Sequence, residues 1–286
     1  MREIVVLSGK GGTGKTTLAG VFATLGQEAV MADADVDAAN LHLILRPRVL
    51  DEEPFSGSRQ PVVDQEVCIQ CGLCTELCRF DAIEDGLVDE IACEGCEVCF
   101  HACPVEAVRL EDTRSGNIYT CSTDYGPFVY AKLGVAQENS GKLVVRVKER
   151  AREVAERENK HTVVVDGAPG IGCPVIASLG GVDLTLIVTE PTAAGFHDLD
   201  RVLGLARHFG VPAAVCVNKA DLDEGVTTAI EDHCRLENVA FVGRIPFARG
   251  VVQSLVARSP VTEDRAGEAA SAMHDVWRRT LDLLPN

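Results

Sequence analysis

Residues 4–17 read IVVLSGKGGTGKTT, and this stretch decides the fold. It begins with a continuous apolar run, Ile4–Leu7, which is typical of a strand buried on both faces of a parallel sheet. A glycine-rich segment follows, and Leu18–Leu25 then shows helical periodicity. The stretch therefore predicts a strand, a glycine-rich loop and a helix, in that order.

The glycine-rich segment satisfies the GxxxxGK[ST] pattern of a phosphate-binding loop. Its backbone N–H groups would close around phosphate oxygens, Lys15 would reach the β- and γ-phosphates, and Thr16 would ligate Mg²⁺. A purely structural glycine-rich turn would not need the lysine and the threonine in register. The predicted phosphate-binding residues are Gly9, Gly11, Gly12, Thr13, Gly14, Lys15, Thr16 and Thr17.

Similar apolar runs predict further buried strands at Ala29–Ala32, Thr162–Val165, Leu184–Val188, Ala213–Val217 and Ala240–Val242. The segments between most of them are long enough for crossover helices. We therefore predict an α/β fold with a doubly wound, mostly parallel sheet, of the P-loop NTPase type. Residues 141–159 have helical composition, and residues 269–284 have the periodicity of a helix that packs on the core.

Lys10 directly follows the first glycine of the loop, and a lysine at this place indicates a particular subtype of phosphate-binding loop. A lysine at this place resembles the deviant Walker A loop of the MinD/ParA/nitrogenase-iron-protein superfamily, and the resemblance extends over essentially the whole chain. It implies a homodimer that sandwiches ATP between two protomers, with Lys10 contacting nucleotide across the interface as an arginine finger does. An ordinary surface lysine is the simpler alternative.

The same resemblance assigns roles to two aspartate-containing segments at strand ends, where ligands of open α/β sheets bind. Residues 33–40 are similar to switch I, so Asp35 would orient or activate the attacking water and Asp33 would lie nearer Mg²⁺. Residues 166–174 are similar to a Walker B motif merged with switch II, so Asp166 would hold Mg²⁺ through water and Gly170 would sense the γ-phosphate. The expected catalytic residues are Lys10, Lys15 and Asp35.

Base recognition is expected at Asn218-Lys219-Ala220-Asp221, after the strand that ends at residue 217. Taken alone, this motif resembles the guanine-reading motif of GTPases, so GTP is an alternative ligand. In the superfamily that the loop resembles, an asparagine here reads adenine with help from a segment like residues 244–247, which favours ATP. The predicted base-binding residues are Asn218, Asp221 and Pro246.

Eight of the twelve cysteines form two CxxCxxCxxxC runs, the pattern of two-cluster bacterial ferredoxins. In that pattern the fourth cysteine of each run ligates the other cluster. One [4Fe-4S] cluster would then use Cys68, Cys71, Cys74 and Cys103, and the other would use Cys93, Cys96, Cys99 and Cys78. Zinc is the alternative, although structural zinc usually pairs two CxxC elements across a longer spacer.

The cysteine-rich segment interrupts the regular alternation of predicted strands and helices. We predict an inserted ferredoxin-like domain over residues 59–111, within a discontinuous P-loop ATPase domain formed by residues 1–58 and 112–286. Residues 54–58 would be the entry linker, and the exit would fall within residues 111–116. Cys121, Cys216 and Cys234 are expected to be buried, whereas Cys173 could provide an extra site between protomers, since the nitrogenase iron protein places cluster ligands near switch II.

Charge and hydropathy restrict the partners. The 27 Lys and Arg residues against 43 Asp and Glu residues give a net charge of −16, which argues against nucleic acid as a ligand. Residues 62–111 contain twelve acidic side chains and two arginines, a local charge of −10 that favours a basic partner protein. The chain lacks an apolar stretch of about 20 residues, so we expect a cytoplasmic protein without membrane insertion.

These patterns together predict an ATP-hydrolysing iron–sulfur protein that couples ATP-dependent dimerisation to electron transfer with a partner protein. Two alternatives belong to other functional classes. One is an ATP-dependent carrier that assembles or delivers iron–sulfur clusters, although the short CPxC-like site of such carriers is missing. The other is a spatial organiser of the MinD/ParA kind, for which the acidic charge is unfavourable.

Overall fold

The computed structural model describes residues 1–286 except 27, 135–139 and 285–286. Its internal contacts divide the chain into two compact units. The first unit contains Met1–Glu52, Ile118–Lys132 and the chain from Ser140 onward, and the second contains Glu53–Asn117 together with residues 133 and 134. The segment predicted as an insert, residues 59–111, lies inside the second unit.

In the described part of the chain, nine strands form one sheet in the order β11-β10-β9-β1-β8-β2-β7-β6-β3. The six strands predicted from apolar runs are present in it, and each is parallel to its neighbours among them. They are β1 (Arg2–Ser8), β2 (Ala29–Asp33), β8 (Thr162–Pro169), β9 (Leu184–Thr189), β10 (Ala213–Asn218) and β11 (Ala240–Ile245). The predicted α/β fold with a mostly parallel central sheet is therefore confirmed.

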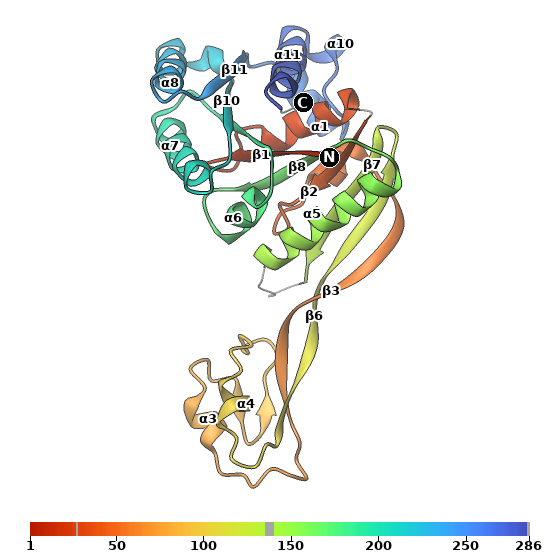
Figure 1. The fold of residues 1–286 in the computed structure, drawn as a ribbon, viewed down its shortest axis with the longest axis vertical. Coiled ribbons are helices and arrows are strands. Elements are labelled where there is room, and N and C mark those ends of the chain that lie inside the picture. Colours follow the sequence, from red (N-terminus) through yellow and green to blue (C-terminus); the bar gives the residue numbers. More distant parts are fainter. Residues whose placement is uncertain (27, 135–139, 285–286) are drawn as a thin grey trace. The chain divides into compact units, whose positions relative to one another are not determined.

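Helices cover both faces of this sheet (Figure 1). One face carries α1 (Lys15–Leu25) and α11 (Glu268–Asp282), and the other carries α5 (Ser140–Arg157), α6 (Cys173–Leu179) and α7 (Ala193–His208). The remaining helices are α8 (Glu224–Leu236), which packs on β10 and β11, the short η1 (Ala220–Leu222), α2 (Leu41–Leu45), α9 (Arg249–Val256) and α10 (Glu263–Ala266).

The C-terminal helix α11 packs on the core, as its periodicity predicts. Met273, Val276 and Trp277 are buried, and the Trp277 ring lies 4.6 Å from the ring of Phe22 on α1, measured between centroids. Among the described residues, no helix has the length and apolar character needed to cross a membrane.

The strands that lead into and out of the second unit were not predicted. β3 (Arg48–Val63) contains the expected linker, residues 54–58, and β6 (Val108–Thr123) contains the expected exit, residues 111–116. β6 is joined by two residues to β7 (Gly126–Leu133), a connection that antiparallel neighbours permit. Pro54 is tolerated more readily because β3 is the edge strand of the sheet and pairs on one side only. These segments are therefore paired strands rather than linkers.

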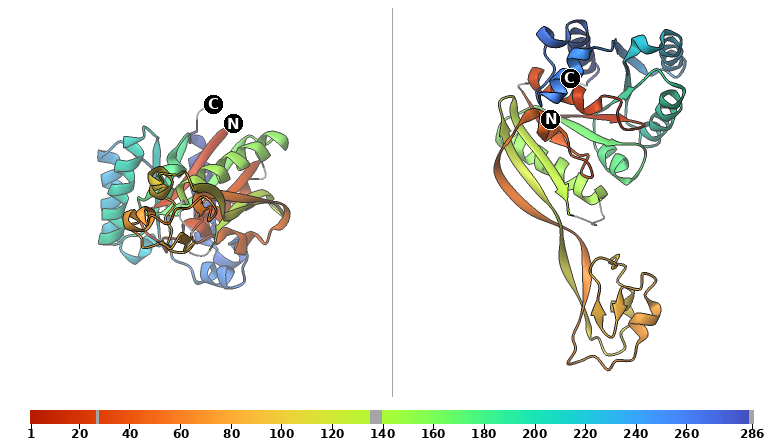
Figure 2. Two further views of the ribbon diagram at one scale, coloured as in Figure 1. Left: turned by 90° about the horizontal axis from the view of Figure 1, so that it is seen from below. Right: turned by 180° about the vertical axis from the view of Figure 1, so that it is seen from behind.

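The second unit repeats one local structure with a spacing of 25 residues. Its two short helices, α3 (Leu73–Leu77) and α4 (Val98–Ala102), each follow a residue with positive φ and each end at a cysteine. Figure 2 shows them grouped with the hairpin of β4 (Ile83–Glu84) and β5 (Leu87–Val88). The apolar core beneath is small, with Ile83, Cys99 and Val108 as its buried members.

In the first unit, α6 is anchored by a buried lysine of α5. Lys148 Nζ donates to the carbonyl oxygens of Ser178 and Gly180, at 2.6 and 2.7 Å, and lies 3.2 Å from Glu3 Oε1. Its side chain is only 3% exposed. Because these carbonyls terminate a helix, a cation there compensates both the unpaired acceptors and the helix dipole.

We expect Lys148→Met to lower the free energy of unfolding by about 3 kcal/mol, because it leaves buried acceptors and a buried carboxylate short of a partner. Arg157→Met is the matched control on the same helix, since the Arg157 side chain is 58% exposed and should cost less than about 0.5 kcal/mol. Urea denaturation followed by circular dichroism measures both. Equal losses in the two variants would contradict the assignment.

Candidate functional site

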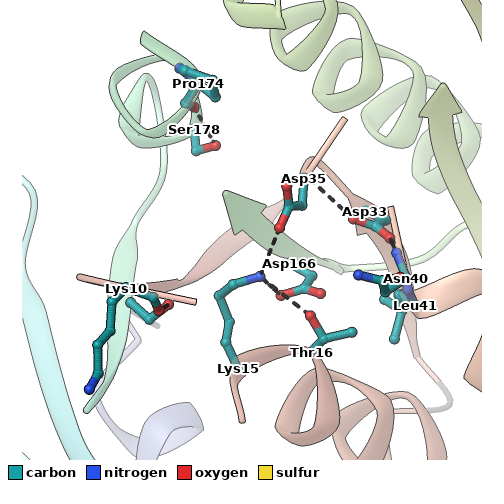
Figure 3. Close-up of polar contacts among 11 residues, drawn as sticks. Lys10, Lys15, Thr16, Asp33, Asp35, Asn40, Leu41, Asp166, Pro174 and Ser178 are labelled. Carbon is teal, nitrogen blue, oxygen red and sulfur yellow. Dashed lines mark hydrogen bonds and ion pairs between the residues drawn. The ribbon is translucent and has the colours of Figure 1, made fainter. Parts of the chain in front are cut away.

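Four functional side chains meet at the carboxyl edge of the sheet, where β1, β8 and β2 end. Parallel pairing aligns Asp33 at the end of β2 with Asp166 on β8. Lys15 begins α1 after the glycine-rich loop, and its Nζ lies 2.6 Å from Asp166 Oδ1 and 4.0 Å from Asp35 Oδ2 (Figure 3). The structure thus brings together Lys15 and the three aspartates that the sequence assigned to Mg²⁺ and water.

These side chains are largely withdrawn from solvent. Burial alone would lower the pKa of Lys15, but the charge of Asp166, reinforced by Asp33 and Asp35, outweighs it and raises the pKa. Burial, followed by the charge of Asp166, raises the pKa of Asp33 to about 8, although Lys15 and backbone N–H groups oppose the shift. Three carboxyl groups around one ammonium are an environment that a further cation would stabilise.

Asp33 also holds the segment that follows it. Its Oδ1 accepts the Asp35 N–H at 3.1 Å, and its Oδ2 accepts the N–H groups of Asn40 and Leu41 at 3.1 and 3.0 Å. The switch I candidate is therefore tied back to the end of β2, and α2 begins at this tether. Asp35, by contrast, keeps 15% of its side chain exposed, and its Oδ2 lies 4.0 Å from Lys15 Nζ.

Two buried oxygens near the lysine have no hydrogen-bond partner among the described residues. They are Asp166 Oδ2 and Thr13 Oγ1. Buried polar groups are normally paired, so each calls for a partner supplied by a ligand or by water. A Mg²⁺-bound water beside Asp166 and a phosphate oxygen beside Thr13 fit these two positions.

A cavity of about 510 Å³ opens beside this group, within the range of small-molecule sites. Its lining contains residues 11–17 of the loop together with Asp35, Asn218 and Pro246. Asp33, Asp166 and Gly170 do not line it; Gly170 has φ 91° and donates its N–H to Ser8 O at 2.8 Å. The sequence interpretation missed an apolar wall from α9, although its apolar spacing after Pro246 was visible: Val251, Val252 and Leu255.

The loop and the base-reading motif are in close contact. Asn218 Nδ2 donates to Thr13 O at 2.7 Å, and a Cβ added at Gly14 would lie 2.2 Å from that nitrogen. Gly14 also has φ 92°, a left-handed conformation that favours glycine. Glycine at position 14 therefore meets both a steric and a backbone requirement.

A family model described as the CobQ/CobB/MinD/ParA nucleotide binding domain matches residues 4–261. The chain belongs to this nucleotide-binding family. It is 32% identical over 225 residues, 77% of its length, to "Uncharacterized protein MJ0578" of Methanocaldococcus jannaschii, covering 79% of that protein. It is 26% identical to the septum site-determining protein MinD of Synechocystis, over 97% of this chain and 88% of that one.

Solved structures share the fold of this MinD/ParA-family chain. The MinC:MinD cell division complex of Aquifex aeolicus matches with a TM-score of 0.58 at 19% identity, covering 100% of this chain and 98% of that one. Apo McdA from Cyanothece matches with a TM-score of 0.60 at 17% identity, covering 98% and 99%. At such identities the likeness concerns the fold alone.

Lys10, which directly follows the first glycine of the loop, is not directed at the phosphate site of its own chain. Figure 3 shows its side chain apart from the pair of Lys15 and Asp166. Its Nζ lies 3.3 Å from Glu190 Oε2, and 34% of the side chain is exposed. A contact with nucleotide through Lys10 would therefore require it to leave this position.

The eight clustered cysteines are gathered around two cavities in the second unit. A cavity of about 440 Å³ is lined by one predicted ligand set, Cys68, Cys71, Cys74 and Cys103. A smaller one, of about 20 Å³, is lined by the other set together with Cys74: Cys78, Cys93, Cys96 and Cys99. All eight thiols are free, so disulfides do not explain their proximity.

The fourth cysteine of each run is held by the backbone four residues later. Ala82 N–H donates to Cys78 Sγ at 3.4 Å, and Ala107 N–H donates to Cys103 Sγ at 3.2 Å. Burial opposes ionisation of Cys103, but the N–H groups of residues 105–108 together outweigh it and lower its thiol pKa. Sulfur atoms that accept backbone N–H bonds are suited to act as thiolate ligands.

Among the described residues, no group of three or more Cys, His, Asp or Glu is arranged to hold a single metal ion. An iron–sulfur cluster distributes four cysteines over four irons and needs no such convergence on one point. Three of the other cysteines, Cys121, Cys216 and Cys234, are buried as predicted, whereas Cys173 is exposed at the start of α6.

Asp221, a predicted base-binding residue, is engaged with the backbone: its Oδ1 accepts the Phe247 N–H at 2.6 Å. We expect Asp221→Asn, which retains an acceptor oxygen, to leave the preference between ATP and GTP unchanged. Asp221→Ala should weaken both nucleotides by about three- to tenfold, because the segment after Pro246 loses its tether. Isothermal calorimetry measures the affinities. A selective loss of GTP binding in Asp221→Asn would show instead that the carboxylate reads guanine.

Proposed function

We propose that this chain binds and hydrolyses ATP and carries two [4Fe-4S] clusters, and that ATP-dependent dimerisation is coupled to electron transfer with a partner protein. The observation that carries the proposal is the presence, in one chain, of a phosphate loop facing buried carboxylates and of eight free cysteines around two cavities. Membership of the CobQ/CobB/MinD/ParA family supports its nucleotide-binding half.

In the nucleotide half, the loop backbone and Lys15 would bind the phosphates. Thr16, Asp33 and Asp166 would hold Mg²⁺, and Asp35 would orient water from the cavity wall that it lines. Bound ATP·Mg²⁺ supplies the transferable phosphoryl group and neutralises part of its charge. Binding also gives Lys15 a phosphate partner and gives the buried carboxylates a divalent cation, which removes the charge imbalance described above.

In the redox half, the crossed cysteine sets would hold the clusters, and the clusters supply one-electron chemistry when bound. The N–H bonds to Cys78 and Cys103 support thiolate ligation at the two crossing positions. Zinc remains the competing occupant. The acidic side chains of residues 62–111, ten of them exposed, favour a basic partner protein as the electron donor or acceptor.

The path of the chain after the switch I candidate supports coupling between the nucleotide site and the cysteine-rich second unit. Asp33 tethers α2, and β3 starts at Arg48, three residues after α2 ends. The ring of His42 on α2 stacks on Tyr130 of β7 at 5.1 Å, and Tyr130 stacks on Tyr119 of β6 at 4.8 Å. A shift of switch I on nucleotide binding would thus act on the strands that continue into the second unit.

A spatial organiser is the second candidate, because MinD proteins are among the relatives. It accounts for the nucleotide site but leaves the cysteines without a role. A cluster carrier is the third candidate, and transfer of iron to an apo-acceptor protein would distinguish it.

Purified without oxygen, the protein should contain about eight iron atoms per chain and little zinc. Cys71→Ser should lower the iron content by up to about half, since one of four ligands to one cluster is replaced. Cys121→Ser, which changes a buried cysteine of the first unit, is the matched control and should retain all the iron. Metal analysis by plasma mass spectrometry decides the point, and stoichiometric zinc in place of iron would refute the redox half.

Lys15→Ala should abolish detectable ATP binding, because it removes the one buried cation facing the phosphate cavity in the described site. Asp35→Asn should still bind ATP but hydrolyse it about 100-fold more slowly, as expected for loss of a residue that orients or activates water. Calorimetry and phosphate release measure the two steps, with Arg157→Ala on exposed α5 surface as control. Unchanged ATP hydrolysis in both variants would show that ATP is not hydrolysed at this site.

A further inference from the structure

Glu190 lies between two lysines at the nucleotide edge of the sheet. It directly follows β9, whose neighbours in the sheet are β1 and β10. Its Oε2 is 3.3 Å from Lys10 Nζ, from the loop after β1, and its Oε1 contacts Lys219 Nζ, after β10. One carboxylate thus connects the ends of three adjacent strands.

The triad is charged and partly shielded from solvent. Only 13% of the Glu190 side chain is exposed. Burial alone would raise the pKa of Glu190, but Lys219 and then Lys10 outweigh it and lower the pKa, so the carboxylate is ionised at neutral pH. Among the described residues, Glu190 provides the only carboxylate within ion-pair distance of Lys10 Nζ.

The two lysines are held differently. Lys219 Nζ also lies 3.3 Å from Gly12 O, so it remains anchored to the loop on its own. Lys10 has Glu190 as its side-chain partner and is 34% exposed. If Lys10 leaves, Lys219 still neutralises Glu190, so departure of Lys10 does not strand a buried, unpaired carboxylate.

We propose that Glu190 is a positioning residue that retains Lys10 against its own protomer until a partner's nucleotide displaces it. The inference rests on the proposed ATP-dependent dimer, in which Lys10 acts across the interface. On dimerisation, Lys10 would then leave the Glu190 carboxylate and contact phosphate oxygens of the nucleotide bound to the other protomer. Glu190 thereby raises the ATP concentration needed for dimerisation and recaptures Lys10 after the protomers separate.

The test is Glu190→Gln, which keeps the side-chain shape and an acceptor for Lys219 but removes the charge that retains Lys10. Sedimentation velocity with a non-hydrolysable ATP analogue should show half-maximal dimerisation at about three- to tenfold lower analogue concentration than for the wild type. Glu237→Gln is the matched control, because Glu237 pairs with Arg207 at 2.7 Å on the exposed surface. It should dimerise as the wild type does.

A second readout needs no dimer. In the nucleotide-free protein, mass spectrometry after brief acetylation should show Lys10 modified several-fold faster in Glu190→Gln than in the wild type or in Glu237→Gln. Lys10→Ala should itself weaken dimerisation, and adding Glu190→Gln to it should not restore dimerisation, since the residue that Glu190 retains is gone.

The outcomes separate the inference from the proposed function. If the wild type dimerises with the analogue but Glu190→Gln shows no shift and no faster acetylation of Lys10, the role of Glu190 is refuted and the dimer stands. If Lys10→Ala dimerises as well as the wild type, the role of Lys10 across the interface is refuted, and the inference is refuted with it.

Discussion

The contact between Lys15 and Asp166 is the interaction on which the nucleotide site depends. It joins the loop after β1 to the adjacent strand β8, at 2.6 Å, with both side chains almost fully buried. Parallel register adds Asp33 from the next strand, so the site contains more buried acid than base. Such an arrangement is costly without a cation and phosphate, and it explains why the glycine-rich loop, the two switch candidates and the carboxyl edge occur at one place.

The sequence predicted the elements whose structure is determined by their own residues. Buried parallel strands such as Thr162–Val165 are continuous apolar runs, and the loop from Gly9 to Thr17 leaves few alternatives for its backbone. The sequence analysis missed the elements and contacts that depend on residues far away in the chain. β3 contains Pro, Ser, Gly and acidic residues, β6 contains Ser, Gly and acidic residues, and both become strands only because each pairs with a neighbour. The partner of Lys10 was equally hidden, since Glu190 lies 180 residues away and no local pattern links them.

The cysteine-rich second unit has a different basis for its stability from the first, nucleotide-binding unit. Its apolar core is too small to account for its order, and its two halves repeat one turn, one short helix and one sulfur-capping N–H. The proposed clusters, once bound, would supply much of the stability of this unit. The acidic surface of this unit would favour a basic partner protein.

The central claim is that one chain holds iron–sulfur clusters and ATP and that each responds to the other. The most direct measurement is the low-temperature electron paramagnetic resonance spectrum of the reduced protein, recorded with and without ATP·Mg²⁺. The account predicts cluster signals whose shape or midpoint potential changes with ATP in the wild type and not in Lys15→Ala. A spectrum without cluster signals, or one that ATP leaves unchanged in the wild type, would contradict it.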